Sequence, residues 1–180
     1  MSPRRFFDSH RLKASLAILA LTAGLFGLSR HLRLNSTDSA PRGLYLIWPG
    51  EPHPGSWVAV CLSPELGRFS RRRGYLPRGT CPAGAAPVLK RLAAAPGDRI
   101  DLGPTGLWVN GRRQVASSPQ SLDSRGRALP VPRYGSYRVG EAELWLMSPH
   151  PKSWDSRYFG PLERDRLLGI AKPVWIWGNR

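Results

Sequence analysis

Lysine is the side chain with the clearest potential for acid–base chemistry in this sequence, because it is rare here. Of the 27 basic residues only four are lysines, namely Lys13, Lys90, Lys152 and Lys172. A neutral lysine can take a proton from a serine when burial lowers its pKa, whereas arginine stays protonated. Lys90 lies in the apolar run VLKRLAAA, which would either desolvate its ammonium group or turn it outward from an alternating strand. Lys152, in a polar segment flanked by proline, is the rival candidate.

Ser39 is the serine with the most suitable surroundings for a nucleophile. It lies in the stretch NSTDSAPRG, residues 35–43. A turn fixed by Pro41 and Gly43 would leave backbone N–H groups free to bind an oxyanion, and Thr37 would add a hydroxyl donor. Taken alone, the stretch is more typical of a polar linker than of an active site.

Other catalytic groups have no convincing setting. A Ser-His-Asp triad needs a histidine that is held by a carboxylate and close to a serine. The histidines instead flank the apolar N-terminal segment or lie between prolines: His10, His31, His53 and His150. Asp and Glu are few and scattered, and two cysteines without paired histidines do not complete a zinc site. We therefore expect neither a histidine triad nor a metal or cofactor.

Cys61 and Cys81 both follow the apolar N-terminal segment. In an exported domain they can form one disulfide that closes the arginine-rich loop between them. The alternative is that they are two unrelated small buried residues, and the sequence does not decide between the two.

The net charge of +15 is compatible with nucleic acid, anionic lipid or an acidic partner. The excess is almost entirely arginine, which is often an imprint of genome composition, and we favour that explanation over nucleic-acid binding. The alternative is a non-catalytic basic module that binds nucleic acid or anionic lipid through Arg71, Arg72 and Arg73.

Residues 14–29, ASLAILALTAGLFGLS, carry no charge and predict a transmembrane helix. They would span about 24 Å, somewhat less than a hydrocarbon core of about 30 Å, and flanking basic residues could snorkel to make up the difference. A cleaved signal peptide is the alternative, although Gly27-Leu28-Ser29 is a poor cleavage site because an arginine follows it. We expect a cytoplasmic tail (1–13), an anchor (14–29) and an exported domain (30–180).

The rest of the chain predicts a mainly β domain, sandwich-like or barrel-like, built from short antiparallel strands. Turn-forming residues separate short apolar runs, and 18 prolines and 19 glycines argue against a helical bundle. The expected strands are 43–48, 56–62, 88–95, 99–102, 107–109, 137–139, 143–147 and 170–177, with Asn110-Gly111 as a tight turn. Ser63–Thr80 is expected to be a basic loop and Val115–Pro132 an exposed excursion.

Three blocks in order resemble the type I signal peptidases, most closely their TraF-type branch. The first is Asn35-x-Thr37-x-Ser39-x-Pro41-x-Gly43-Leu44-Tyr45 and the second is Lys90-Arg91-Leu92 leading into Pro96-Gly97-Asp98. The third is Ser153-x-Asp155-Ser156-Arg157-Tyr158-Phe159-Gly160-Pro161. Together the blocks extend over nearly the whole chain after the apolar segment.

The resemblance implies a serine–lysine peptidase, with Ser39 as nucleophile and Lys90 as general base. It also implies that Thr37 helps to form the oxyanion hole and that Ser153 orients the Lys90 amine. Two further residues, Asp155 and Arg157, would brace the site from behind, and the aspartate would bear on how the product is handled.

The resemblance further implies an exported precursor as substrate, bound as an extended strand with small residues before the cut. A conjugative pilin subunit fits the TraF-type branch, with hydrolysis or cyclisation completing the reaction at the periplasmic side of the inner membrane. Ala40 replaces the methionine of housekeeping signal peptidases, which favours a dedicated substrate over a general signal peptidase role. The membrane lipid around the N-terminal helix is the other expected partner.

Overall fold

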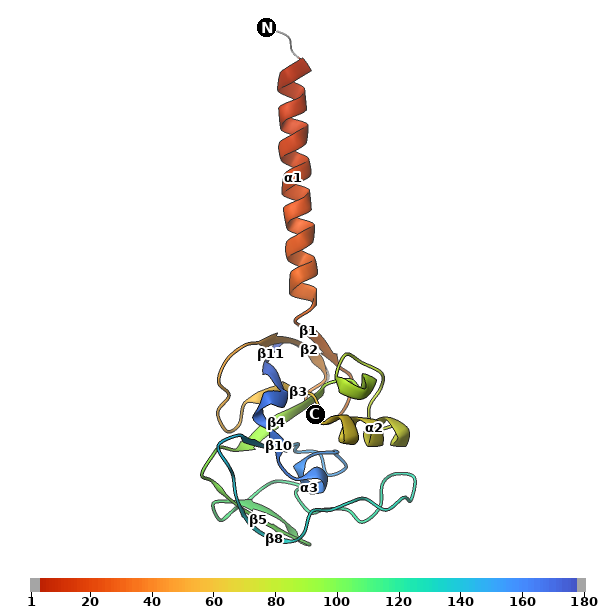
Figure 1. Ribbon diagram of the computed structural model, residues 1–180, viewed down its shortest axis with the longest axis vertical. Coiled ribbons are helices and arrows are strands. Elements are labelled where there is room, and N and C mark those ends of the chain that lie inside the picture. The colour runs from red at the N-terminus through yellow and green to blue at the C-terminus, as the bar shows by residue number, and fades with distance from the viewer. Residues whose placement is uncertain (1–3, 178–180) are drawn as a thin grey trace. The chain divides into compact units, whose positions relative to one another are not determined.

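The computed structural model describes residues 4–177 and divides into two units, with the boundary after Leu32. The N-terminal unit is one helix, α1 (Arg4–Ser29) (Figure 1). Within α1, the stretch from His10 to Ser29 is long and apolar enough to cross a membrane. Its 20 residues give about 30 Å at the helical rise, close to the thickness of a hydrocarbon core. The helix therefore begins earlier than the apolar run at residues 14–29.

The second unit is mainly β, as expected from the turn pattern. Its larger sheet has seven strands in the order β1-β2-β11-β3-β4-β9-β10. The pairings from β2 to β10 are antiparallel. The strands are β1 (Leu32–Asn35), β2 (Gly43–Trp48), β3 (Trp57–Val60), β4 (Val88–Ala94), β9 (Glu143–Met147), β10 (Leu162–Glu163) and β11 (Leu167–Ile176).

Two expectations for this unit were wrong. The segment Ser63–Thr80, expected as a loop, contains the helix α2 (Pro64–Arg73). The Ser63 hydroxyl caps the helix by accepting from the Leu66 N–H at 3.3 Å, and Gly74 ends it with a φ of 74°. The second error is in the list of expected strands, which left out β1 and β10.

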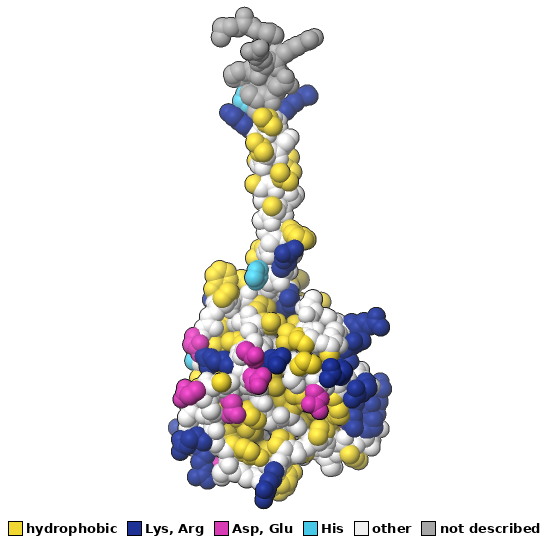
Figure 2. All heavy atoms as spheres, in the orientation of Figure 1, with side chains coloured by type: hydrophobic (Ala, Val, Ile, Leu, Met, Phe, Trp, Pro, Cys, Tyr) yellow, Lys and Arg dark blue, Asp and Glu magenta, His cyan; other side chains and the backbone are white. Residues whose placement is uncertain are grey.

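Figure 2 shows one group of basic side chains on the side of the domain where Figure 1 places α2, and further basic side chains elsewhere on the same face. The last turn of α2 holds Arg71, Arg72 and Arg73, where positive charge complements the helix dipole. The arginine run is therefore compatible with a helix end, and its charge was not a sound reason to expect a loop.

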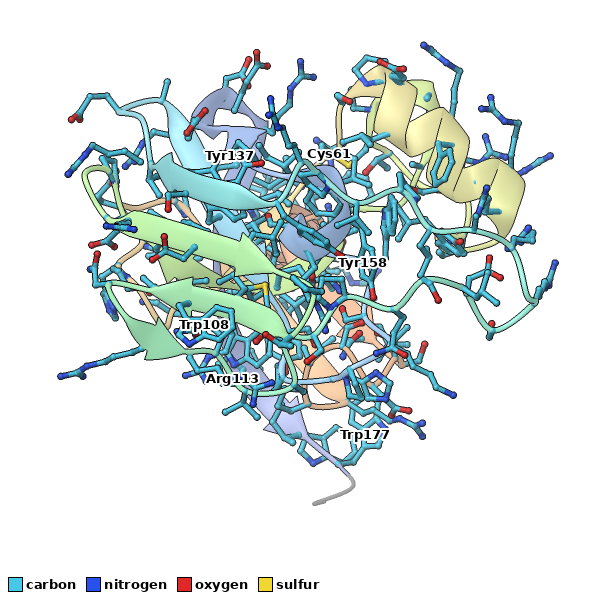
Figure 3. The ribbon with its side chains drawn as sticks, turned by 90° about the horizontal axis from the view of Figure 1, so that it is seen from below. Cys61, Trp108, Arg113, Tyr137, Tyr158 and Trp177 are labelled. Atoms are coloured by element: carbon cyan, nitrogen blue, oxygen red, sulfur yellow. A yellow bond between two sulfur atoms is a disulfide. The ribbon has the colours of Figure 1, made fainter. Side chains whose placement is uncertain are left out.

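A second sheet has four strands in the order β7-β6-β5-β8. They are β5 (Arg99–Gly103), β6 (Gly106–Val109), β7 (Arg112–Arg113) and β8 (Gly135–Arg138). The hairpin of β5 and β6 is confirmed, as is the Asn110-Gly111 turn, where both residues have positive φ. Figure 3 shows Trp108 and Arg113 side by side here, with the guanidinium carbon 6.0 Å from the ring centroid.

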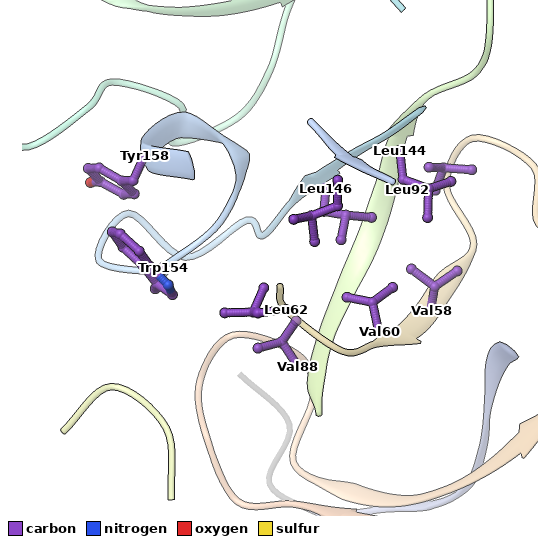
Figure 4. Packing of buried hydrophobic residues seen from close by; sticks show 10 residues of the cluster. Val58, Val60, Leu62, Val88, Leu92, Leu144, Leu146, Trp154 and Tyr158 are labelled. Atoms are coloured by element: carbon purple, nitrogen blue, oxygen red, sulfur yellow. The ribbon is translucent and has the colours of Figure 1, made fainter. Parts of the chain in front are cut away.

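The main core lies against the larger sheet and contains apolar residues from β3, β4 and β9 (Figure 4). Its ten buried members are Val58, Val60, Leu62, Val88, Leu92, Leu144, Leu146, Trp154, Tyr158 and Leu162. Two smaller clusters lie under the second sheet and around β2. The main core thus borders the strand that carries Lys90 and includes the residue after Ser153.

A disulfide joins Cys61, directly after β3, to Cys81, which lies beyond α2. It closes a segment with a sequence separation of 20 residues, so both ends of the segment that contains α2 are fixed to the domain. The excursion Val115–Pro132 was expected to be exposed, but it mixes exposed and half-buried residues, and Ser117 within it is buried.

Candidate active site

Lys90 lies in the middle of β4, opposite Val58 of β3. Residues 88–94 alternate between the two faces of the sheet, and Lys90 shares the buried face with Val88 and Leu92. Only 4% of Lys90 is exposed. Of the two orientations that the sequence allowed, the structure therefore shows the inward one.

Burial lowers the pKa of Lys90 to about 8. The carboxylate of Asp155 opposes this shift and the guanidinium of Arg157 adds to it. Desolvation disfavours the charged amine, so Lys90 is neutral far more often near neutral pH than an exposed lysine is. A buried amine with such a pKa can accept a proton, which an exposed lysine does far less readily.

Ser153 connects Lys90 to Ser39. The Lys90 Nζ donates to Ser153 Oγ at 2.7 Å, and the Ser153 hydroxyl lies 3.3 Å from Ser39 Oγ. Ser153 is buried, and Ser39 is half-buried in the turn before β2. Residues from three distant parts of the chain thus form one hydrogen-bonded line, which runs from the Lys90 amine through the Ser153 hydroxyl to the Ser39 hydroxyl.

The turn that carries Ser39 is held by Asn35, whose role the sequence did not suggest. The buried Asn35 amide nitrogen donates to the carbonyls of Ala40 at 2.9 Å and Pro41 at 3.1 Å. Its amide oxygen accepts from the Thr37 hydroxyl at 2.8 Å. Thr37 therefore lies beside Ser39, but its hydroxyl must rotate away from Asn35 before it can donate to an oxyanion.

Ser148 is a second residue that sequence reasoning missed. Its hydroxyl donates to the Ser39 carbonyl at 2.7 Å, and its backbone N–H donates to Asp155 Oδ2 at 3.1 Å. Ser148 thereby links the Ser39 turn to the segment that carries Ser153. Only its position directly after the apolar run 143–147 could have drawn attention to it.

Asp155 and Arg157 form a buried ion pair, with Arg157 Nη2 2.7 Å from Asp155 Oδ2 and neither side chain exposed. Asp155 also caps the short helix α3 (Ser156–Phe159). The remaining guanidinium hydrogens go to backbone carbonyls, among them those of His150 at 2.9 Å and Ser153 at 3.2 Å. Since a buried pair needs such added hydrogen bonds, the network fixes the loop on which Ser153 lies.

The Ser39, Lys90 and Ser153 side chains line a cleft of about 590 Å³. Thr37 lines it too, and the exposed Lys152 lies at its edge. Asp155 and Arg157 do not line it, so they stand behind the site. The structure therefore brings four of the predicted site residues to the cleft and places two in support.

A buried amine beside two serine hydroxyls in a cleft of a mainly β domain suits peptide-bond chemistry. The sequence matches the family described as "Signal peptidase, peptidase S26" over residues 9–177. Because this match covers most of the chain, the protein belongs to that family of serine peptidases.

Curated relatives include the plasmid transfer protein TraF of Escherichia coli, which is 37% identical over 167 residues, covering 91% of this chain and 92% of the relative. The conjugal transfer protein TraF of Agrobacterium tumefaciens (strain 15955) is 38% identical over 168 residues, with 91% and 92% covered. A signal peptidase I structure from Enterococcus faecalis V583 has 20% identity and a TM-score of 0.40, covering 68% of this chain and 98% of that one. The family match and the curated TraF relatives confirm the resemblance to TraF-type signal peptidases.

Proposed function

We propose that this protein is a membrane-anchored serine endopeptidase in which Ser39 is the nucleophile and Lys90 the general base. The observation that carries the proposal is the hydrogen-bonded line from the buried Lys90 amine through Ser153 to Ser39. The lowered pKa of Lys90 supports the role of base, because a base works best when its pKa lies near the operating pH.

The mechanism follows from the positions of these atoms. With Lys90 neutral, the Ser153 hydroxyl gives its proton to Lys90 Nζ and receives the Ser39 proton in return. Ser39 Oγ then attacks the scissile carbonyl. The net result is that one proton moves from Ser39 to Lys90 Nζ, and the positive charge of the new ammonium balances the negative charge of the oxyanion. The Ser39 N–H and the rotated Thr37 hydroxyl stabilise the oxyanion. As the tetrahedral intermediate collapses, the Lys90 ammonium returns a proton to the leaving amine and an acyl-enzyme forms.

Two routes can resolve the acyl-enzyme. Water attacks it in hydrolysis, or an amine of the substrate attacks it and forms a new peptide bond, which makes a cyclic product. The curated relatives are named as plasmid and conjugal transfer proteins. These names support a role in conjugation. As the finer part of the proposal, the substrate is an exported pilin subunit and cyclisation is the second route.

The location belongs to the same proposal. Residues 1–13 form the cytoplasmic tail, residues 14–29 cross the inner membrane, and residues 30–180 carry the site on the periplasmic side. A span in α1 long enough to cross a membrane supports the anchor, and the Cys61–Cys81 disulfide supports an oxidising compartment.

The test is precursor processing in cells that express Ser39→Ala, Lys90→Ala or Lys90→Arg. All three variants should accumulate uncleaved precursor, and Lys90→Arg should do so although it keeps the charge, because arginine does not give up its proton. Lys152→Ala is the matched control and should process normally. Normal processing by Ser39→Ala or by Lys90→Arg would refute the mechanism.

A general signal peptidase role is the main competing function. The expected result for a dedicated enzyme is that the protein does not rescue a strain depleted of its own signal peptidase I. Rescue would show that its substrate range is broad.

A further inference from the structure

The cleft extends well beyond the three residues that do the chemistry. Its far part, which we call the distal arm, is lined by six mostly apolar residues: Tyr75, Leu76, Leu122, Leu129, Trp154 and Tyr158. The distal arm is continuous with the site around Ser39, since both belong to one cleft of about 590 Å³. Whatever lies in the arm is therefore within reach of the reacting bond.

The floor of the distal arm is rigid and aromatic. Trp154 and Tyr158 stack with ring centroids 5.6 Å apart and an interplanar angle of 14° (Figure 4). Trp154 also stacks on Phe69 of α2, with centroids 5.4 Å apart. Trp154 directly follows Ser153, so the floor and the hydroxyl beside Lys90 belong to the same short loop. A floor of this kind suits an apolar or aromatic side chain.

The two walls come from segments that have no direct part in the chemistry. Tyr75 and Leu76 belong to the segment closed by the disulfide, and Leu122 and Leu129 belong to the excursion Val115–Pro132. Figure 1 shows α2 and the excursion on the same side of the domain. The arm is thus formed between them, above the Trp154 floor.

Polar contacts at the rim tie the two walls together. The Tyr75 hydroxyl donates to Asp123 Oδ2 at 2.6 Å. Arg73 donates to the Ala128 carbonyl at 2.6 Å, and Arg127 donates to the Arg73 carbonyl at 2.7 Å. Asp123 also pairs with Arg127 at 2.7 Å, so its charge is already compensated and the arm offers no free carboxylate to a cationic ligand.

We infer that the distal arm is a subsite for one bulky apolar side chain of the substrate. This inference rests on the proposed function, because it places the arm's occupant on the same polypeptide as the bond that Ser39 attacks. The resemblance to signal peptidases implies a small residue next to the cut, so we place the bulky residue further along the bound strand. An enzyme that recognises both this bulky residue and the small residue next to the cut accepts fewer substrates than one that recognises the small residue alone.

Leu122 is the best residue for a test because it lines the arm and is 54% exposed, so changing it leaves the core intact. Val115 is its matched control, an apolar residue in the same excursion that is 75% exposed and does not line the cleft. Leu122→Asp puts a charge into the arm, Leu122→Phe keeps it apolar, and Val115→Asp puts the same charge outside it.

The full-length protein in detergent is tested on a fluorescence-quenched peptide library. Each peptide has alanine before the scissile bond, and one other position at a time carries alanine, leucine, phenylalanine or glutamate. We expect one position at which leucine or phenylalanine raises kcat/KM about ten- to hundredfold over alanine, as a hydrophobic pocket allows. Leu122→Asp should reduce that preference to about twofold, whereas Leu122→Phe and Val115→Asp should keep it.

Two results would overturn the inference: wild-type cleavage without a bulky apolar preference at any position, or a full preference in Leu122→Asp. Failure of the proposed function looks different, because it would appear as cleavage by Ser39→Ala or as no cleavage by the wild-type protein. The same library therefore separates the two failures.

Discussion

In the proposed mechanism, burial makes Lys90 a usable base and also sets the pH range in which the enzyme works. The pKa of about 8 means that about a tenth of Lys90 is neutral at pH 7. Because only the neutral amine accepts a proton, kcat/KM should rise with pH and level off above pH 8. Initial rates on a peptide substrate between pH 6 and 10 would test this. A rate that stays flat between pH 6 and 8 would argue against Lys90 as the base.

The effect of Ser153 on the pKa of Lys90 can be tested separately from its contribution to packing. Ser153 accepts a hydrogen bond from the buried ammonium of Lys90, so Ser153→Ala removes a contact that stabilises the charged form and should lower the Lys90 pKa. The rise of kcat/KM should then move below pH 8 while the maximal rate falls about a hundredfold or more.

Ser148→Ala is the control for this change, because Ser148 contacts the Ser39 carbonyl and not Lys90. It should leave the midpoint of the pH profile unchanged. A purely structural role for Ser153 would lower thermal stability without moving that midpoint.

At the same scale, sequence reasoning could name the residues that we propose to react, but not the residues that hold them in place. Lys90 attracted attention through its rarity and its apolar run, yet apolar residues on both faces of β4 left its orientation open. The exposed Arg91 next to it shows, in retrospect, which face looks outward. Asn35 and Ser148 act through contacts with backbone carbonyls near Ser39, and such contacts depend on how the chain folds back, which no local pattern encodes.

At the scale of elements, the strands were predictable because apolar runs between turn residues mark them. The range 143–147 agrees with β9, and 43–48 agrees with β2. The helix α2 was missed although Ser63, Pro64 and Gly74 are typical helix boundaries, because the arginine run drew attention to charge. β1 is a short strand at the edge of the larger sheet, where mixed polar and apolar residues give little periodic signal.

The disulfide is the element-scale feature with the clearest energetic consequence. Cys61 and Cys81 close a segment with a separation of 20 residues, and closing such a loop stabilises a protein by about 3 kcal/mol in the chain-entropy view. The Cys61→Ser, Cys81→Ser double variant should therefore melt about 6 to 12 °C lower. Calorimetry with and without reductant tests this, since reductant should lower the Tm of the wild-type protein and leave that of the variant unchanged. Equal melting of the two proteins in oxidising buffer would show that the bond does not constrain the domain.

For the whole molecule, the first question is whether α1 stays attached. A retained anchor predicts that the protein remains in the membrane fraction after alkaline extraction and that its intact mass includes residues 1–29. A periplasmic domain predicts that alkaline phosphatase fused after the last residue is active. An intact mass that lacks the N-terminal segment would instead establish a cleaved signal peptide.

The second question at this scale is what the net charge of +15 does. Figure 2 shows basic side chains at several places on the domain, with one group on the side of α2. A shallow hollow on α2 is lined by Arg68, Arg71 and Arg72. Arg68 and Arg72 are exposed and do not line the catalytic cleft. Exposed charges are screened over about 8 Å at physiological salt, and neither arginine lines the cleft, so we expect them to have little effect on the reaction at Ser39.

The Arg68→Glu, Arg72→Glu double variant should therefore process precursor within about twofold of wild type, a limit that allows for a modest change in electrostatic steering. Ser39→Ala in the same cells should abolish processing. If the protein were a non-catalytic basic module, the two variants would give the opposite results. Charge reversal would remove its binding to nucleic acid or anionic lipid, and Ser39→Ala would have no effect. Binding of the module would also weaken steeply with salt, whereas catalysis at a partly enclosed site depends on salt only weakly. Measuring processing and salt dependence in both variants thus decides whether the arginines serve the reaction or only accompany it.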